Sequence, residues 1–376
     1  MLTKLLEGEE TYMKKTRYVF ASLAALALVA TACGSDDDTT SGSAAPGVTA
    51  GADDTTAPAD TASDATTAPD ATTAPDDTAS ADTVDVTAGE DVTIAIITHG
   101  DNGVFWSVFQ KGAEDAGSTL GITVNYQGSE NTGTTQASMI NQAVADGVDG
   151  LAVSLADPDA VRDAVAAAVD AGIPLVTTNS GSDLYKEFGA FTHIGQDEFT
   201  AGAGAGEKFN EAGATVLLCA KQEQTNTGLD ARCEGAESTF SGTFLDPITT
   251  SGDNSGKQQA DMKAAIDADP SIDAVFGVGP VIAHDAAAAV KELGRTITIG
   301  GVDLSPDLLA DIAAGDVLFT IDQQQYLQGY ISVVALYLNV TNQNTLGGGL
   351  PINTGPGFVT TDNADAVSAL VDAGTR

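Results

Sequence analysis

Short runs of polar residues follow the apolar, β-branched segments of this 376-residue chain. These runs are rich in amides, hydroxyls and carboxylates: Thr98 to Asn102, Ser154, Thr178 to Ser180, Gln222 to Asn226, Gly277 to Pro280, Asp303, and Asp322 to Gln325. An aromatic pair, Phe105 and Trp106, stands beside the first run. Carboxylates and amides bind hydroxyl groups in pairs, and an aromatic face covers the apolar C–H face of a sugar. The mixture predicts a site for a polyol rather than for a phosphate or a lipid.

Strand-like and helix-like segments alternate from residue 92 onward. Val92–Thr98 is a nearly unbroken apolar, β-branched run, typical of a strand buried on both faces. Further strands are predicted at Val124–Gln127, Leu151–Ser154, Leu175–Thr178, Val216–Cys219, Ala274–Val278, Ile297–Val302 and Leu318–Ile321. Helices are predicted at Phe105–Leu120, Gln136–Asp146, Pro158–Ala171, Leu229–Ser241, Gln258–Asp267, Ala283–Leu293 and Pro306–Ala314. The alternation indicates an α/β fold with parallel sheets, divided into two lobes, with ligand at the carboxyl ends of the strands.

The first 33 residues have the order of an export signal. A basic segment, Met13–Arg17, precedes an apolar run, Tyr18–Val29, and small residues lead to Cys33. The ending is similar to a bacterial lipobox, although Ala30 stands where Leu or Val is preferred. The resemblance implies cleavage before Cys33 and a lipid on its sulfur, with ordinary cleavage and a free thiol as the alternative. Residues 1–12 are acidic where export signals avoid acid, so we expect the chain to start at Met13.

Residues 34–91 contain 14 acidic residues and neither Lys nor Arg. They are mostly Asp, Thr, Ala and Pro, and they lack the large apolar residues that would offset the entropy of ordering. We predict a disordered, extended tether between the lipid and the folded part.

Charge and motifs exclude several classes of function. The net charge is −38, so nucleic acid is a poor partner. No Cys/His cluster has metal-ligand spacing, and no catalytic triad or phosphate-binding loop is present. Gly202–Gly206 lacks the spacing and the position of a dinucleotide fingerprint, and we expect its small residues to allow a helix to pack closely on a sheet. The sequence predicts no cofactor, no metal ion and no enzymatic activity.

The stretch from Thr93 to Trp106 resembles the opening of the ribose/galactose-type periplasmic binding proteins. Three further motifs match that family: Asp157-Pro-Asp-Ala-Val161, Ala171-Gly-Ile-Pro-Leu175 and Gly300-Gly-Val-Asp303. The resemblance implies the type I periplasmic binding protein fold, with two Rossmann-like lobes, three hinge crossings and a ligand in the cleft. The expected N-terminal lobe is 92–196 with 323–354, and the expected C-terminal lobe is 197–322 with 355–376.

The family's binding positions fall on polar and aromatic residues of this chain. The resemblance implies a ligand site made of Asp101, Asn102, Phe105, Trp106, Ser154, Asn179, Arg232, Asp303 and Gln323. Two departures matter, because Asn179-Ser180 replaces an Asp-Arg pair and Gly279-Pro280 replaces an Asn-Asp pair. We therefore do not expect ribose itself as the ligand.

Each of these positions also has a purely structural interpretation. Trp106 could be buried in the core, Asp303 could cap the helix that begins near Pro306, and Arg232 could pair with Glu234 or Glu237 on its own helix. His99 adjoins the polar loop without an obvious partner, so ligand contact and a structural role stay equally open. We expect His193 and His284 to be structural.

The resemblance and the export signal together predict the substrate-binding lipoprotein of an ABC importer. It would be a monomer on the outer face of the cell membrane that carries a monosaccharide, sugar alcohol or cyclitol to permease subunits. A sensory co-receptor of the same fold is one alternative, and an extracytoplasmic sugar-acting enzyme is another.

Two cysteines of the folded part are placed to form a disulfide. Cys219 ends a predicted strand and Cys233 lies in the helix that follows, in a chain bound for a non-reducing compartment. Two buried, unpaired thiols are the alternative.

The first testable prediction concerns maturation. Cys33→Ser removes the sulfur that would carry the lipid, so the protein should leave the membrane fraction or stay unprocessed. Fractionation and intact-mass analysis measure this outcome. Cleavage elsewhere, with a free Cys33 thiol in the unaltered protein, would contradict lipidation.

Overall fold

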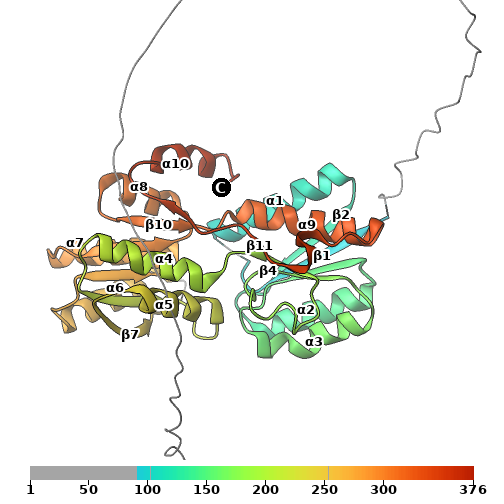
Figure 1. The fold of residues 1–376 in the computed structure, drawn as a ribbon, viewed down its shortest axis with the longest axis horizontal. Helices are drawn as coiled ribbons and strands as arrows, with labels where there is room; N and C mark the ends of the chain where they lie inside the picture. Colours follow the sequence, from blue (N-terminus) through green and yellow to red (C-terminus); the bar gives the residue numbers. More distant parts are fainter. Residues whose placement is uncertain (1–90, 102, 253) are drawn as a thin grey trace, which may run out of the picture. The chain divides into compact units, whose positions relative to one another are not determined.

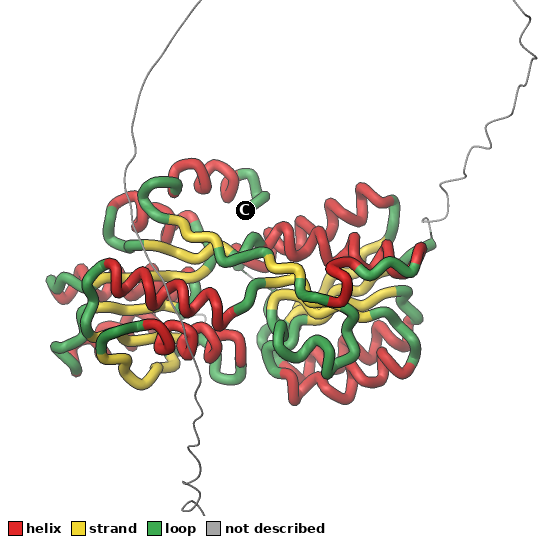
Figure 2. The backbone as a smooth tube through the Cα atoms, in the orientation of Figure 1, coloured by secondary structure: helices red, strands yellow, loops and turns green. Residues whose placement is uncertain are grey.

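The computed structural model describes residues 91–376 except 102 and 253. These residues form two six-stranded sheets of mostly parallel strands, each covered by helices on both faces (Figures 1 and 2). The predicted α/β fold class, with parallel sheets divided into two lobes, is confirmed. Cys33, the export signal and nearly all of the predicted tether lie outside the described residues. Within the described part, no helix combines the length and the apolar character needed to cross a membrane.

The sheet of the first lobe, called the N-lobe below, has the strand order β2-β1-β3-β4-β5-β11, and all its pairs are parallel. Its elements are β1 (Thr93–Thr98), α1 (Val104–Leu120), β2 (Thr123–Gly128), α2 (Gly133–Asp146), β3 (Gly150–Val153), α3 (Pro158–Asp170), β4 (Leu175–Asn179), β5 (Thr192–Gly195), α9 (Gln325–Asn342), η2 (Leu346–Gly349) and β11 (Ile352–Asn353). Because the order is not sequential, the strand ends near β1 and β3 open toward a crevice, as in other doubly wound sheets.

Strand β1 forms because both of its faces are buried. Ile94 and Ile96 pack with α1 and α9, whereas Ala95 and Ile97 pack with α2 and α3. Successive side chains of a strand point to opposite faces, so an unbroken apolar run serves two helical layers. The strand is thereby fixed in place, and the polar loop that follows it is held at the edge of the sheet.

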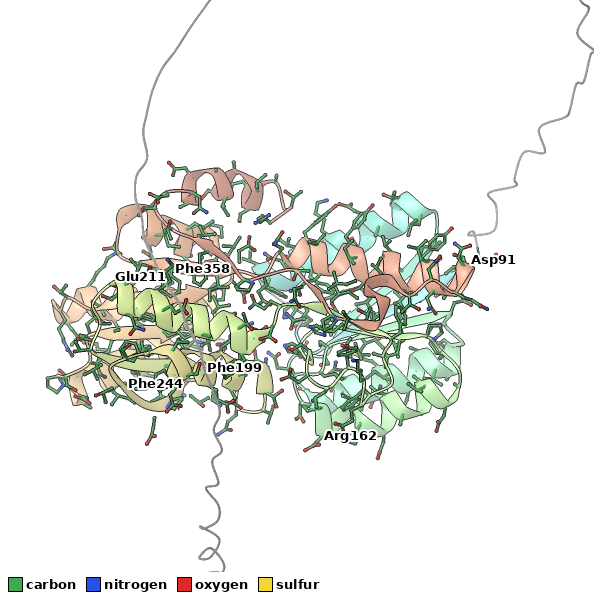
Figure 3. All side chains as sticks on the ribbon, viewed as in Figure 1. Asp91, Arg162, Phe199, Glu211, Phe244 and Phe358 are labelled. Carbon is green, nitrogen blue, oxygen red and sulfur yellow. A yellow bond between two sulfur atoms is a disulfide. The ribbon has the colours of Figure 1, made fainter. Side chains whose placement is uncertain are left out.

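The second lobe, the C-lobe, repeats this arrangement with the strand order β7-β6-β8-β9-β10-β12. Its elements are α4 (Glu198–Glu211), β6 (Val216–Lys221), α5 (Thr227–Thr239), β7 (Thr243–Thr249), α6 (Ser255–Ala268), β8 (Ala274–Gly277), α7 (Pro280–Leu293), β9 (Thr298–Val302), α8 (Pro306–Ala314), β10 (Phe319–Asp322), β12 (Gly357–Val359) and α10 (Ala364–Asp372). Only β12, against β10, is antiparallel among its described pairs. Side chains of both lobes fill the spaces between sheets and helices (Figure 3).

Helices α4 and α5 lie unusually close together because glycines face each other between them. A Cβ on Gly202 would lie 2.0 Å from the carbonyl oxygen of Arg232, and one on Gly235 would lie 2.1 Å from that of Phe199. The expectation that the small residues of Gly202–Gly206 let a helix pack on a sheet holds for Ala205, which lies in the core with residues of β6 and β8. Gly202 instead lets α4 pack against α5, and the contact includes the backbone of Arg232.

The chain passes between the two sheets three times, at 195–198, 322–325 and 353–357. The second crossing is held by polar contacts of Asp322, which is almost completely buried. Its Oδ1 accepts from the backbone N–H of Gln324 at 2.7 Å, and its Oδ2 accepts from Nε of Arg376 at 2.6 Å. A backbone hydrogen bond from Thr227 of the C-lobe to Ala156 of the N-lobe, 3.1 Å long, also joins the lobes at the cleft.

Cys219 of β6 and Cys233 of α5 are joined by a disulfide, with their Cα atoms 5.8 Å apart. Both residues are buried in the core between the sheet and helices α4 and α5. The bond closes a loop with a sequence separation of 14 residues. This loop includes the segment between β6 and α5.

The second prediction tests this bond. In the Cys33→Ser background, alkylation of the denatured, unreduced protein should leave Cys219 and Cys233 unmodified, and reduction should expose both. Replacing both by Ala should lower the free energy of unfolding by about 3 kcal/mol in the chain-entropy model for a loop of this size. Alkylation of both cysteines without reduction would show that the bond is absent.

Candidate functional site

A cavity of about 720 Å³ lies between the carboxyl ends of the strands of the two sheets. The N-lobe contributes the loops after β1, β2 and β4, and the C-lobe contributes the loops after β6, β8 and β9 together with the start of α5. Gln323 enters from the second hinge crossing. The volume lies in the range of small-molecule sites.

Seven of the nine residues expected to bind ligand line this cavity: Asp101, Phe105, Trp106, Asn179, Arg232, Asp303 and Gln323. Asn102 lies outside the described residues. Ser154 is fully buried and does not line the cavity. Its Oγ accepts from the backbone N–H of His99 at 2.7 Å and lies 2.8 Å from Nδ1 of the same residue.

The structure therefore gives Ser154 a supporting position behind His99. Gln136 donates to the Ser154 carbonyl oxygen at 2.8 Å and closes off the space behind it. His99 itself lines the cavity. Burial lowers the pKa of its imidazole, with Glu223 opposing that shift and Arg232 adding to it, so the ring is held in its neutral form.

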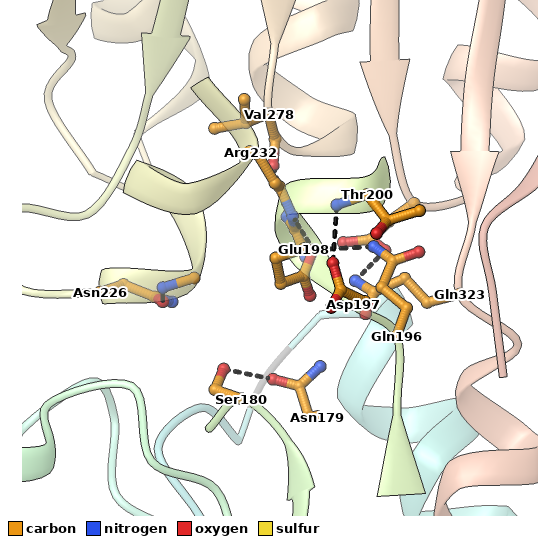
Figure 4. Close-up of polar contacts among 12 residues, drawn as sticks. Asn179, Ser180, Gln196, Asp197, Glu198, Thr200, Asn226, Arg232, Val278 and Gln323 are labelled. Atoms are coloured by element: carbon orange, nitrogen blue, oxygen red, sulfur yellow. Dashed lines mark hydrogen bonds and ion pairs between the residues drawn. The ribbon is translucent and has the colours of Figure 1, made fainter. Parts of the chain in front are cut away.

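Arg232 reaches the cavity from α5 and is fixed by a carboxylate on α4. Its Nε donates to Oε2 of Glu198 at 2.6 Å, its Nη2 donates to Oε1 at 3.0 Å, and its Nη1 donates to the Val278 carbonyl oxygen at 2.7 Å (Figure 4). Both side chains of the ion pair are at least nine-tenths buried. The expected alternative, a pair with Glu234 or Glu237 on the same helix, is wrong.

The geometry leaves Arg232 with capacity for a ligand. A guanidinium has five N–H groups, and three of them are engaged. Burial alone would lower the pKa of Arg232, but the carboxylates of Glu198, Asp303 and Glu223 outweigh it and raise the pKa above its ordinary value. The side chain is thus a permanently charged donor with one N–H remaining on each terminal nitrogen.

Asp303 follows β9 and has a left-handed backbone conformation, with φ of 69°. Its Oδ1 accepts from Nε2 of Gln323 at 2.6 Å. Helix α8 is capped by Ser305, whose Oγ accepts from the Leu308 N–H at 3.2 Å. The alternative role of Asp303 as a helix cap is therefore wrong, and its carboxyl group is available at the cavity wall.

The aromatic pair serves both the core and the cavity. Trp106 is 9% exposed and packs in the N-lobe core, with ring centroids of His99 and Phe105 each 4.9 Å away. A Cβ on Gly100 would lie 2.0 Å from its indole Nε1, so the loop after β1 can cover the indole only with glycine at that position. Trp106 is therefore both part of the core and part of the cavity wall.

Sequence reasoning missed the residue that orients Arg232. Glu198 begins α4 directly after the first hinge crossing, 34 positions before its partner, and its Oε2 also accepts from Nε2 of Gln196 at 2.8 Å. The one signal in the sequence is an acidic residue at the start of a helix, and this signal does not identify Arg232 as the residue that Glu198 binds. The loop residue Glu130, with φ of 51°, was also missed and lines the cavity.

Comparison with known proteins places the chain and its fold in a family. Residues 94–344 match the family model of the periplasmic binding protein domain. The chain belongs to this family. It is 29% identical to the xylose/arabinose-binding protein XylF of Sulfolobus acidocaldarius over 291 residues. This alignment covers 72% of this chain and 71% of that protein. It is 25% identical over 295 residues to a xylitol-binding protein of Mycolicibacterium smegmatis, over 75% of this chain and 81% of that protein.

A solved structure extends the similarity. The carbohydrate transporter of Acidothermus cellulolyticus, in complex with myo-inositol, has 39% sequence identity and a TM-score of 0.73, over 76% of this chain and 100% of that chain. The resemblance to the binding proteins of sugar ABC transporters is confirmed for this member of the periplasmic binding protein family.

The third prediction follows from the burial of Asp303. Burial raises the pKa of its carboxyl group from 3.8 to about 7, against the opposing effects of Arg232 and Gln323. The folded state thus favours the protonated form, and the contribution of Asp303 to stability, full below pH 4, is lost as the pH rises toward 7. Asp303→Asn should therefore make the ligand-free protein more stable at pH 8, by at most about 4 kcal/mol, with little difference at pH 4.

Urea unfolding at pH 4, 6 and 8 measures this effect. Asn keeps the acceptor for Gln323 and tolerates the left-handed backbone, so the variant removes little besides the charge. Asp362→Asn on the exposed surface is the matched control. A stability difference that stays constant from pH 4 to pH 8 would refute a raised pKa.

Proposed function

We propose that this protein binds a monosaccharide, sugar alcohol or cyclitol in the cavity between its lobes and delivers it to the permease of an ABC importer. The observation that carries this proposal is the arrangement around Arg232. An anchored guanidinium with N–H groups left over, a carboxyl group at Asp303 and the aromatic pair at Phe105 and Trp106 all line one cavity. Paired polar groups beside an aromatic surface suit a ring with several hydroxyls.

Family membership supports a binding and transport role rather than catalysis. The related structure from Acidothermus cellulolyticus holds myo-inositol, and the curated relatives are named for pentoses and xylitol, so small polyols are the ligands to test first. Hinged closure of two lobes around a ligand is the established motion for such folds. In our proposal, the lobes divide as 92–196 with 323–354 and 197–322 with 355–376.

The location belongs to the same proposal. Export, cleavage before Cys33, lipidation and the tether at 34–91 would place the binding module as a monomer on the outer face of the cell membrane. The acidic tether would keep it within reach of membrane permease subunits.

The fourth prediction tests the binding role. The full chain, purified in detergent, is titrated calorimetrically with myo-inositol, xylitol, xylose and arabinose. At least one should bind with a dissociation constant in the micromolar range, about −8 kcal/mol. Arg232→Lys should weaken that binding about tenfold or more, because Lys keeps a charge beside Glu198 but loses the planar set of donors.

Trp106, the sole tryptophan of the chain, provides a second measurement through its fluorescence. Arg162→Lys is the control, because Arg162 forms its ion pair with Glu187 on the surface of the N-lobe. Folded protein that binds none of these polyols would contradict the proposed function. Equal affinities of Arg232→Lys and the unaltered protein would move the site away from this cavity.

A further inference from the structure

The cavity carries more negative than positive charge. Among its described lining residues are four carboxyl groups, on Asp101, Glu130, Glu223 and Asp303, against the guanidinium of Arg232 and a neutral His99. The charge of Arg232 is already balanced by Glu198, which forms two hydrogen bonds with it from outside the cavity lining. With Arg232 balanced, Glu130 and Glu223 leave the wall that faces a ligand with an excess of negative charge.

Asp303 is the buried carboxyl group of this set. Burial raises its pKa to about 7, so near pH 7 it is protonated in part of the molecules until a cation lies beside it. Its side chain belongs to a residue that is 8% exposed and lines the cavity. Oδ1 accepts from Gln323, whereas Oδ2 has no hydrogen bond to any residue that the structure describes. A buried carboxylate is costly unless a cation or several donors satisfy it. The protein supplies one donor and leaves one oxygen open to the cavity.

Glu223 lies near the same place. Its Oε2 accepts from Nδ2 of Asn226 at 2.9 Å, and the residue lines the cavity from the loop after β6. Both Glu223 and Asp303 act on the charge of Arg232, so both are within electrostatic reach of one guanidinium. Two acidic side chains of the cavity wall thus lie near the principal donor, Arg232.

These carboxylates are not arranged for a metal ion. Within the described residues, no group of three or more His, Cys, Asp or Glu side chains could hold one. The cavity is instead large enough for an organic ligand, and its aromatic pair would also attract a cation. The missing positive charge is best supplied by the ligand itself.

We propose that the preferred ligand is a polyol that carries a primary amine, such as an amino sugar or an aminocyclitol, with its ammonium group held by Asp303 and Glu223. This inference rests on the proposed function, because it assumes that the cleft binds a polyol. Asp303 is desolvated in the folded protein before the ligand arrives, so only the ammonium group loses water there on binding. A hydrogen bond between two charged groups is about twice as strong as one between neutral groups.

The fifth prediction compares ligands that differ in one group. Calorimetry at pH 7 on the full chain in detergent uses three pairs: glucosamine and glucose, galactosamine and galactose, and an inosamine and myo-inositol. In at least one pair the amine should bind about tenfold more tightly than its neutral counterpart. Asp303→Asn and Glu223→Gln should each reduce this preference, measured as the ratio of the two dissociation constants, toward one.

Glu211→Gln is the matched control, because Glu211 pairs with Lys208 on the surface, and the ratio should keep its value. Neutral polyols that bind as tightly as their amines in every pair would overturn the amine proposal and leave the polyol function standing. Loss of affinity without a change of the ratio in Asp303→Asn and Glu223→Gln would also overturn it. If none of the six compounds binds, both proposals fail.

Discussion

The buried ion pair between Arg232 and Glu198 is the contact on which the geometry of the cleft depends. Glu198 is among the first residues of the C-lobe after a hinge crossing, and Arg232 projects from the next helix toward the cavity. Removing one partner of such a pair leaves an uncompensated buried charge, at a cost of about 3–5 kcal/mol. The pair therefore links the position of the hinge to the direction of the principal donor in the site.

The backbone that carries Arg232 is held as firmly as its side chain. Gly202 lets α4 approach the Arg232 carbonyl, and the disulfide ties the neighbouring Cys233 to β6. A donor that is already in place loses little conformational freedom when a ligand binds. In the proposed closure, the distance between the lobes changes while each wall of the cavity keeps its shape.

The sequence was sufficient where a local pattern determines the structure. The β-branched run at Val92–Thr98 predicts β1, and residues directly after strands predict most of the cavity lining, because strand ends of parallel sheets share one edge. Local sequence patterns did not predict β5, a four-residue strand with polar Thr and His, or the edge strand β7, which contains Pro247. Helix α9 was missed because its many Ile, Val and Tyr residues are equally typical of strands.

The sequence also did not predict hydrogen bonds between residues that are far apart in the chain. Ser154 follows a strand, as predicted, but whether its hydroxyl faces the cavity or His99 depends on a loop 55 positions away. The same holds for Arg232, whose helix offered three nearer acids, Asp230, Glu234 and Glu237, than the one it binds. Tertiary packing determines the hydrogen-bond partners of buried polar groups, so local sequence patterns do not predict them.

The loop that the disulfide encloses has a consequence for how this protein can change over evolution. Its ends are fixed at Cys219 and Cys233, while its middle, with Glu223 and Asn226, contacts the cavity. Substitutions in the middle can alter the chemistry offered to a ligand without releasing β6 or α5 from the core. Divergence of ligand preference among descendants of this chain should therefore concentrate at 222–225, between β6 and the cap of α5, where substitutions put folding at little risk.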